Sequence, residues 1–189
     1  MNKVWLVALM GLLSPLAFPP FNYVPILLIS YAILFWQIGT TKTRKQAFSS
    51  GFTFAFSHYL IGLYWLFSIV SQYDFLYQVV VVIILLGIIA AISFFYGLIG
   101  YFSKFLPVHH WSWFVLFVPS IASLSEWMRT WFWTGFPWYS PSDAVFDMGL
   151  SSLLPIGGYL SVSFIFYLLS GLLVYVTLNF KHRKTYIIG

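Results

Sequence analysis

The feature that most constrains this chain is a series of long apolar runs, separated by short breaks of proline, charged or polar residues. A helix needs about 20 mostly apolar residues to cross the hydrocarbon core of a bilayer. About six apolar runs occur, over residues 4–18, 23–39, 47–70, 75–102, 111–128 and 150–180, and the first two of them are short. The sequence therefore predicts an all-α fold, a polytopic transmembrane helix bundle of about six spans.

Composition excludes several classes of protein. Hydrophobic residues make up 61% of the 189 residues and charged residues only 7%, whereas a soluble domain has about 25% charged residues. This deficit excludes a soluble enzyme, and the high hydrophobicity excludes a disordered chain. The 9 Lys and Arg residues are too dispersed for a nucleic-acid-binding surface, so we expect no nucleic acid partner. Cysteine is absent from the sequence, which excludes disulfides, thiolate metal sites and a cysteine nucleophile within it.

The N-terminal segment has the charge and apolar length of a secretory signal, because Lys3 precedes an apolar stretch. Pro15 and bulky residues at 16–18 stand where a signal has its small-residue cleavage site. We therefore expect this segment to be retained as a helix. No linker divides the chain, so residues 1–180 are predicted to form one transmembrane bundle, followed by a basic cytoplasmic tail at 181–189.

Basic residues fall on one side when the spans are threaded alternately through a bilayer. This side receives Lys3, Lys42, Arg44, Lys45, Lys104, Lys181, Arg183 and Lys184. Arg129 lies on the other side, together with Asp74, Asp143 and Asp147. Because cytoplasmic loops carry the excess of Lys and Arg, both termini are predicted to be cytoplasmic and the segment 130–149 to lie outside.

The third run carries a stripe of small residues and single polar or aromatic residues on one helix face, Gly51, Ala55, His58, Gly62 and Trp65. The fourth run has Gly87 four residues before Ala91 and Ser93 four before Gly97. Small residues at this spacing let membrane helices approach closely, so these two helices are expected to pack against each other or against their neighbours through them.

His58 and Trp65 have two interpretations each. His58 is either a proton or substrate contact or, as we favour, a neutral His hydrogen-bonded to a Ser, Thr or backbone carbonyl. Trp65 is an interfacial anchor or, because it shares the inward face of the stripe, a substrate-facing residue.

The densest cluster of polar and aromatic residues follows the fifth run. Glu126 and Arg129 are three residues apart, so they share a helix face and are expected to form an ion pair at the membrane boundary. Gly135 and Pro137 then break the helix, between several tryptophans. On composition alone, a structural ion pair with interface anchors is favoured over a pocket for a lipid headgroup and its acyl chains.

The remaining residues match no known catalytic arrangement. There is no Ser-His-Asp set, no His-Glu-x-x-His motif and no Gly-rich phosphate loop. Asp143 and Asp147, four residues apart in a predicted outer loop, are expected to be solvated. No catalytic residue, metal site or cofactor is therefore expected in this sequence.

Four motifs follow one another along the chain. They are Leu16-Ala17-Phe18-Pro19-Pro20-Phe21, Gly62-Leu63-Tyr64-Trp65-Leu66-Phe67-Ser68, Glu126-Trp127-Met128-Arg129 with Thr134-Gly135-Phe136-Pro137-Trp138, and Pro155-Ile156-Gly157-Gly158. In order and spacing they resemble motifs of the bacterial apolipoprotein N-acyltransferase family, over nearly the whole chain.

The resemblance implies an enzyme of lipoprotein maturation in the bacterial inner membrane. Such enzymes move an acyl chain from a phospholipid to the N-terminal amine of a diacylglyceryl-cysteine on a lipoprotein. A nitrilase-like domain outside the membrane carries their Glu-Lys-Cys triad. This sequence resembles the membrane portion alone, so we expect an enzyme that is inactive by itself, either truncated or split, and in the split case its partner would be a separately encoded nitrilase-like domain.

Motif positions give the expected substrate-binding residues. They are Trp65, Glu126, Arg129, Gly135, Phe136, Pro137 and Trp138. After Trp138 this chain departs from the family, which usually continues with a Gly- and Gln-containing turn, whereas here Pro141 stiffens the loop. The alternatives are a small membrane transporter with His58 on its path and a non-enzymatic membrane remnant or assembly partner.

Overall fold

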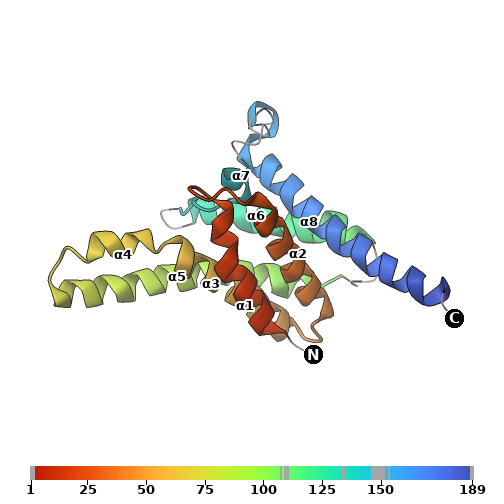
Figure 1. Cartoon of the computed structure of the whole chain (residues 1–189), viewed down its shortest axis with the longest axis horizontal. Helices are drawn as coiled ribbons and strands as arrows, with labels where there is room; N and C mark the ends of the chain where they lie inside the picture. The colour runs from red at the N-terminus through yellow and green to blue at the C-terminus, as the bar shows by residue number, and fades with distance from the viewer. Residues whose placement is uncertain are drawn as a thin grey trace.

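The computed structural model describes residues 3–106, 108, 111–132, 135–145, 152 and 154–187, with side chains up to Asn179. Asp147 and the side chains of the basic tail lie outside this part. Every regular element in these ranges is a helix, which confirms the all-α prediction (Figure 1). The elements are α1 (Val4–Leu13), η1 (Ser14–Ala17), α2 (Val24–Thr40), α3 (Arg44–Gly62), α4 (Trp65–Val70), α5 (Phe75–Ser103), η2 (Trp113–Phe117), α6 (Val118–Trp131), α7 (Pro141–Ala144) and α8 (Leu154–Ile187).

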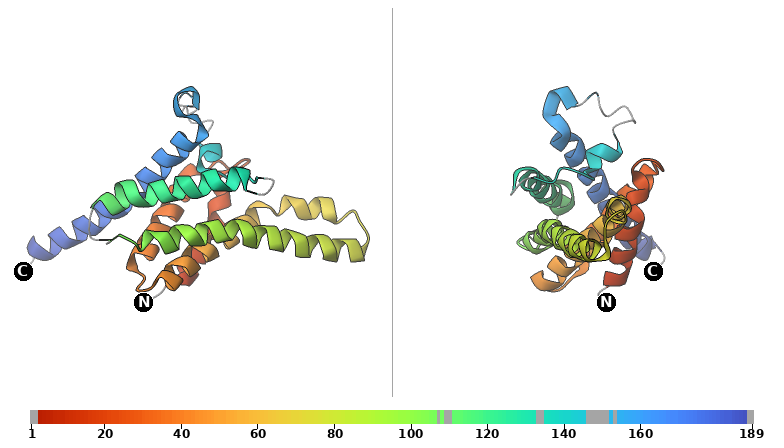
Figure 2. Two further views of the ribbon diagram at one scale, coloured as in Figure 1. Left: turned by 180° about the vertical axis from the view of Figure 1, so that it is seen from behind. Right: turned by 90° about the vertical axis from the view of Figure 1, so that its left-hand side faces the viewer.

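Two of the described helices are long and apolar enough to cross a membrane, α5 and the Leu154–Asn179 part of α8. Two shorter apolar helical stretches, Val4–Ala17 and Val24–Thr40, accompany them. α8 is kinked near its start, where Gly158 has a φ of 68°. In Figure 2, α8 and the α4–α5 pair extend away from the central helices in opposite directions.

The predicted third run is not one continuous helix. α3 ends at Gly62, and a separate short helix, α4, begins at Trp65. The Tyr139 hydroxyl donates a hydrogen bond to the Gly62 carbonyl, so a distant loop occupies the acceptor that the next helical turn would use. α4 then lies beside the N-terminal part of α5, and together they form an arm that projects from the bundle (Figure 1).

α3 packs closely against α5 at Gly51, which belongs to the predicted stripe, and at Ala47 and Gly100, which were not among the predicted residues. A Cβ atom on Gly51 would overlap the Tyr96 carbonyl, and one on Gly100 would overlap the Ala47 carbonyl. The two backbones therefore approach too closely for any larger residue at these positions. Gly87 differs from this expectation, because it lies in the arm and a Cβ there would meet no atom within 4 Å.

Contacts bring several basic residues together at one end of the bundle. Lys104 follows α5, and its Nζ donates to the Gly39 carbonyl near the end of α2 at 3.0 Å. Arg44 lies over the Phe105 ring at 4.0 Å, and Lys3 lies over the Trp36 ring at 5.5 Å. The start of α1, the α2–α3 turn and the end of α5 therefore share this end, which we call the basic end.

Candidate functional site

At the opposite end of the bundle, the buried Arg129 side chain joins α6 to α3 and to the loop that follows α6. Its exposed fraction is 2%. One guanidinium nitrogen donates to the Tyr59 hydroxyl and, at 3.0 Å, to the Trp138 carbonyl. The other donates to Ser140 Oγ at 3.1 Å. The planar fork of an Arg side chain suits such divided bonding, so Arg129 fixes the loop to the bundle.

Glu126 lies one turn earlier on α6 and joins this helix to α8. Its exposed fraction is 3%, and its two carboxylate oxygens accept hydrogen bonds from Ser163 Oγ and the Tyr167 hydroxyl, both at 2.9 Å. Buried carboxylates require such donors, because an unpaired buried charge is costly. The carboxylate is therefore bonded by side chains of α8.

The direct ion pair expected between Glu126 and Arg129 is absent from this part of the structure. Spacing by three puts both residues on one side of α6, but Glu126 turns toward α8 while Arg129 turns toward α3 and the loop. Both groups are buried and not at a solvated boundary. The expectation was wrong because helix spacing does not determine which neighbouring helices supply hydrogen-bond partners.

The loop after α6 is held in a specific backbone conformation. Gly135 has a φ of 76°, and a Cβ atom there would overlap the Thr130 carbonyl. The Phe136 amide then donates back to the Arg129 carbonyl at 2.9 Å. Glycine is suited to this position because L side chains rarely adopt a positive φ. The chain therefore turns sharply away from α6 at the predicted break.

The stretch that departs from the family pattern forms α7. Pro141 occupies the first helical turn, where its missing amide hydrogen costs nothing. Ser140 and Asp143 form a capping box at its N-terminus. Asp143 is exposed, but partial desolvation by its neighbours raises the pKa of its carboxyl, and the hydrogen bond from the Ser140 amide opposes this shift. Ser140 thus links α7 to Arg129.

The hydrogen bonds of Arg129 and Glu126 form a buried charged network. Beside it lies a partly exposed surface of three aromatic residues, the aromatic ledge, made of Trp65, Phe136 and Trp138. Trp65 begins α4 and is 38% exposed, and Trp138 in the loop is 51% exposed. Their ring centroids are 6.1 Å apart, and the Phe136 ring is 5.2 Å from Trp138. Pro137 lies exposed between the two loop aromatics. The ledge therefore joins residues far apart in sequence.

His58 lies beneath these loops and is 2% exposed. Its Nδ1 is 2.6 Å from Ser14 Oγ, and the rings of Phe18, Tyr59 and Tyr139 surround it at centroid distances of 4.9 to 5.8 Å. The hydrogen bond to a Ser is the one that the structural interpretation expects. Nε2 has no hydrogen-bond partner in the described part of the chain.

Several partners in the network were not identified from sequence. They are Ser14, Tyr59, Ser140, Ser163 and Tyr167. Ser163 and Tyr167 are four residues apart in an apolar helix, so they share a face, and this spacing could have revealed them. Nothing local in the sequence distinguishes Tyr59 from the other tyrosines.

Comparisons with known proteins identify the family. The family model described as Apolipoprotein N-acyltransferase N-terminal domain matches residues 10–172. The apolipoprotein N-acyltransferase of Vibrio parahaemolyticus is 27% identical over 91% of this chain and 34% of its own length. Those of Pseudomonas aeruginosa and Methylococcus capsulatus are 28% and 30% identical, over 95% and 91% of this chain and 35% and 34% of their own lengths. The chain thus spans about a third of the length of the curated relatives that it matches. It belongs to the apolipoprotein N-acyltransferase family, whose N-terminal domain it matches.

Proposed function

We propose that this chain forms the membrane domain of an apolipoprotein N-acyltransferase, with about six spans and both termini on the cytoplasmic side of the bacterial inner membrane. The family match and the apolar helices support a membrane domain. Contacts that gather Lys3, Arg44 and Lys104 at the basic end support the orientation. The aromatic ledge would then face the outer side.

The proposed reaction transfers an acyl chain from a phospholipid to the N-terminal amine of a diacylglyceryl-cysteine on a lipoprotein. Family resemblance assigns the chemistry to a Cys in a nitrilase-like domain, and these 189 residues contain no Cys. We therefore expect the 189 residues alone to be inactive and to work with a nitrilase-like domain as partner. The contribution of this chain is to bind the lipid-linked substrates.

The single observation that carries this proposal is the aromatic ledge held above a buried charged network. Trp65, Phe136 and Trp138 offer large apolar faces, which suit acyl chains. Glu126 and Arg129 are positioning residues, since both Glu126 carboxylate oxygens and the two terminal guanidinium nitrogens of Arg129 bond to the protein itself. Gly135 and Pro137 set the path of the loop. His58 has a structural role in this proposal, so it does not support the transporter alternative, which places His58 on a transport path.

The test is N-acylation of a diacylglyceryl-cysteine peptide in liposomes, by this chain alone and with a nitrilase-like domain from the same organism. We expect acylation in the mixture and none with the chain alone. Trp138→Ala should lower kcat/KM in the mixture roughly tenfold, by the loss of an aromatic contact. The control is Trp5→Ala, because Trp5 is an exposed tryptophan near the basic end.

Two results would contradict the proposal. Absence of N-acylation in the mixture, with both components folded, would exclude this chain as the membrane part of the enzyme. Equal activity of Trp138→Ala and Trp5→Ala would exclude the ledge as the substrate surface while leaving the family function intact.

A further inference from the structure

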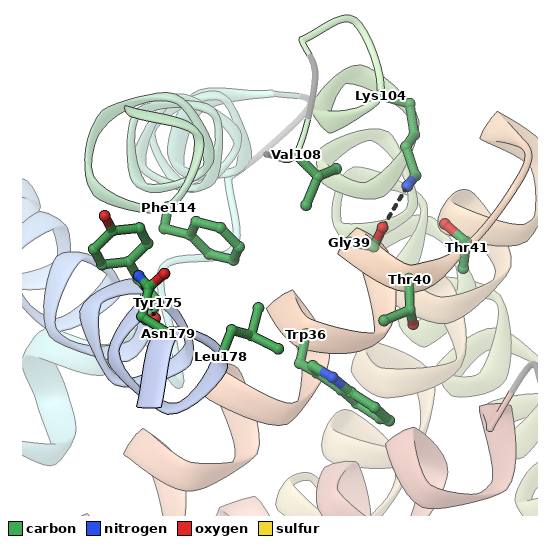
Figure 3. Close-up of a pocket in the computed structure, with 10 residues that line it drawn as sticks. All are labelled: Trp36, Gly39, Thr40, Thr41, Lys104, Val108, Phe114, Tyr175, Leu178 and Asn179. Carbon is green, nitrogen blue, oxygen red and sulfur yellow. Dashed lines mark hydrogen bonds between the residues drawn. The ribbon is translucent and has the colours of Figure 1, made fainter. Parts of the chain in front are cut away.

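A cavity of about 550 Å³ opens at the basic end, between the end of α2, the residues after α5, η2 and the C-terminal part of α8. It lies at the end of the bundle opposite the aromatic ledge. Figure 3 shows Lys104 and Thr40 on one side of it, and Phe114 and Leu178 on the other. Trp36 lines the cavity from α2. One wall therefore carries the Lys104 ammonium and threonine hydroxyls, and the other carries the apolar side chains of Phe114 and Leu178 beside Tyr175 and Asn179.

Lys104 retains hydrogen-bonding capacity toward this cavity. An ammonium group has three N–H donors, and Nζ of Lys104 makes one hydrogen bond in the described part of the chain, to the Gly39 carbonyl. Burial lowers the pKa of Lys104 from its ordinary value. A bound anion would supply the missing acceptors and favour the charged form of this side chain.

The charge around the cavity has one sign. Lys3 and Arg44 lie at the same end of the bundle. The described acidic residues lie elsewhere, with Asp74 at the tip of the arm and Glu126 and Asp143 near the ledge. The basic end thus complements an anionic ligand.

We propose that this cavity binds an anionic phospholipid of the adjacent leaflet, with its phosphate at Lys104 and an acyl chain against Phe114 and Leu178. Basic pockets between membrane helices are suited to lipid headgroups, because a cation sits beside an apolar surface at headgroup depth. The volume suits one ligand of moderate size. This site is separate from the aromatic ledge and takes no part in acyl transfer.

The experiment measures the thermal unfolding midpoint of the full chain in neutral detergent micelles, with dioleoyl phosphatidylglycerol or dioleoyl phosphatidylcholine added. We expect phosphatidylglycerol to raise the midpoint more than phosphatidylcholine, since a ligand that binds the folded state stabilises it. Lys104→Gln should weaken apparent phosphatidylglycerol binding roughly fivefold. Lys42→Gln is the matched control, because Lys42 is exposed and does not line the cavity.

A second variant separates binding from folding. Leu178→Trp fills the apolar side without changing charge, so it should also remove the preference for phosphatidylglycerol. Trp36 gives a direct readout, since brominated phosphatidylglycerol should quench the part of the tryptophan emission that Trp36→Phe removes. Equal stabilisation by the two lipids, an unchanged preference in both cavity variants, or absence of Trp36 quenching would overturn the proposal. None of these results bears on the acylation assay.

Discussion

Arg129 and Glu126 are two opposite charges inside the bundle, and each is bonded mainly by neutral groups of a different neighbour. Arg129 holds Trp138 and Ser140 of the loop. Glu126 holds Tyr167 of α8. Because both charges are removed from water, each also depends on the field of the other, even without direct contact.

At Glu126 and Arg129, removing one charge should lower the free energy of unfolding more than removing both. Glu126→Ala leaves the Arg129 guanidinium uncompensated and should lower the free energy of unfolding by roughly 3–5 kcal/mol. Glu126→Ala/Arg129→Ala removes both charges and should be less destabilised than Glu126→Ala. Denaturant titration in mixed micelles measures this difference. A double variant whose loss equals the sum of the two single losses would show that the charges do not interact.

The positions of these buried polar residues were more predictable from the sequence than their hydrogen-bond partners. Spacing by three put Glu126 and Arg129 on one face of a helix, but it suggested a mutual ion pair that the structure lacks. For His58, a Ser partner was among those expected, yet its identity, Ser14, depends on how α1 and η1 cross α3. Such partners come from tertiary packing, which a periodic pattern does not encode.

Among the helices, α3 and α5 pack closely at Gly51, a small residue of the predicted stripe. Gly51 sits against the Tyr96 backbone, so any Cβ forces the two helices apart. Gly87 is also helical, on the same α5, but faces open space. These two glycines therefore separate the effect of packing from that of helix propensity.

Gly51→Ala should lower the thermal midpoint, with a loss of about 1–3 kcal/mol in the free energy of unfolding, because the overlap strains a tightly packed interface. Gly87→Ala should be neutral or stabilise by up to about 1 kcal/mol, since alanine favours the helix. Thermal unfolding of both variants in the same detergent checks this. Similar losses in the two variants would indicate that the α3–α5 contact is not as close as the structure has it.

Helix boundaries were predictable where they depend on local residues. Proline at 19 and 20 and the polar stretch after Gly39 mark the ends of helices, as expected. The break after Gly62 was missed, because the Tyr139 hydroxyl that takes the Gly62 carbonyl is far away in the sequence. The arm formed by α4 and α5 follows from that break.

For the whole molecule, the proposed orientation is testable because the chain has no native cysteine to label. Gln72→Cys places a thiol in the exposed turn between α4 and α5, and Lys42→Cys places one in the exposed turn between α2 and α3. A membrane-impermeant maleimide added to intact spheroplasts should label Gln72→Cys. Lys42→Cys should be labelled after the membrane is permeabilised.

Labelling in the reverse pattern would invert the proposed orientation, and labelling of both thiols in intact spheroplasts would contradict the number of spans between them. A version of the chain without introduced cysteine gives the background.

The length of α5 has a consequence for the surrounding bilayer. Its 29 residues extend about 43 Å at 1.5 Å per residue, against a hydrocarbon thickness of about 30 Å. A helix this long has to tilt or overhang. α3 packs against the C-terminal half of α5 and holds it in place. A thicker or thinner bilayer would therefore act on the N-terminal half of α5. This half packs against α4, whose first residue is Trp65. In the proposed membrane arrangement, we therefore expect membrane thickness to affect the depth at which the aromatic ledge meets lipid.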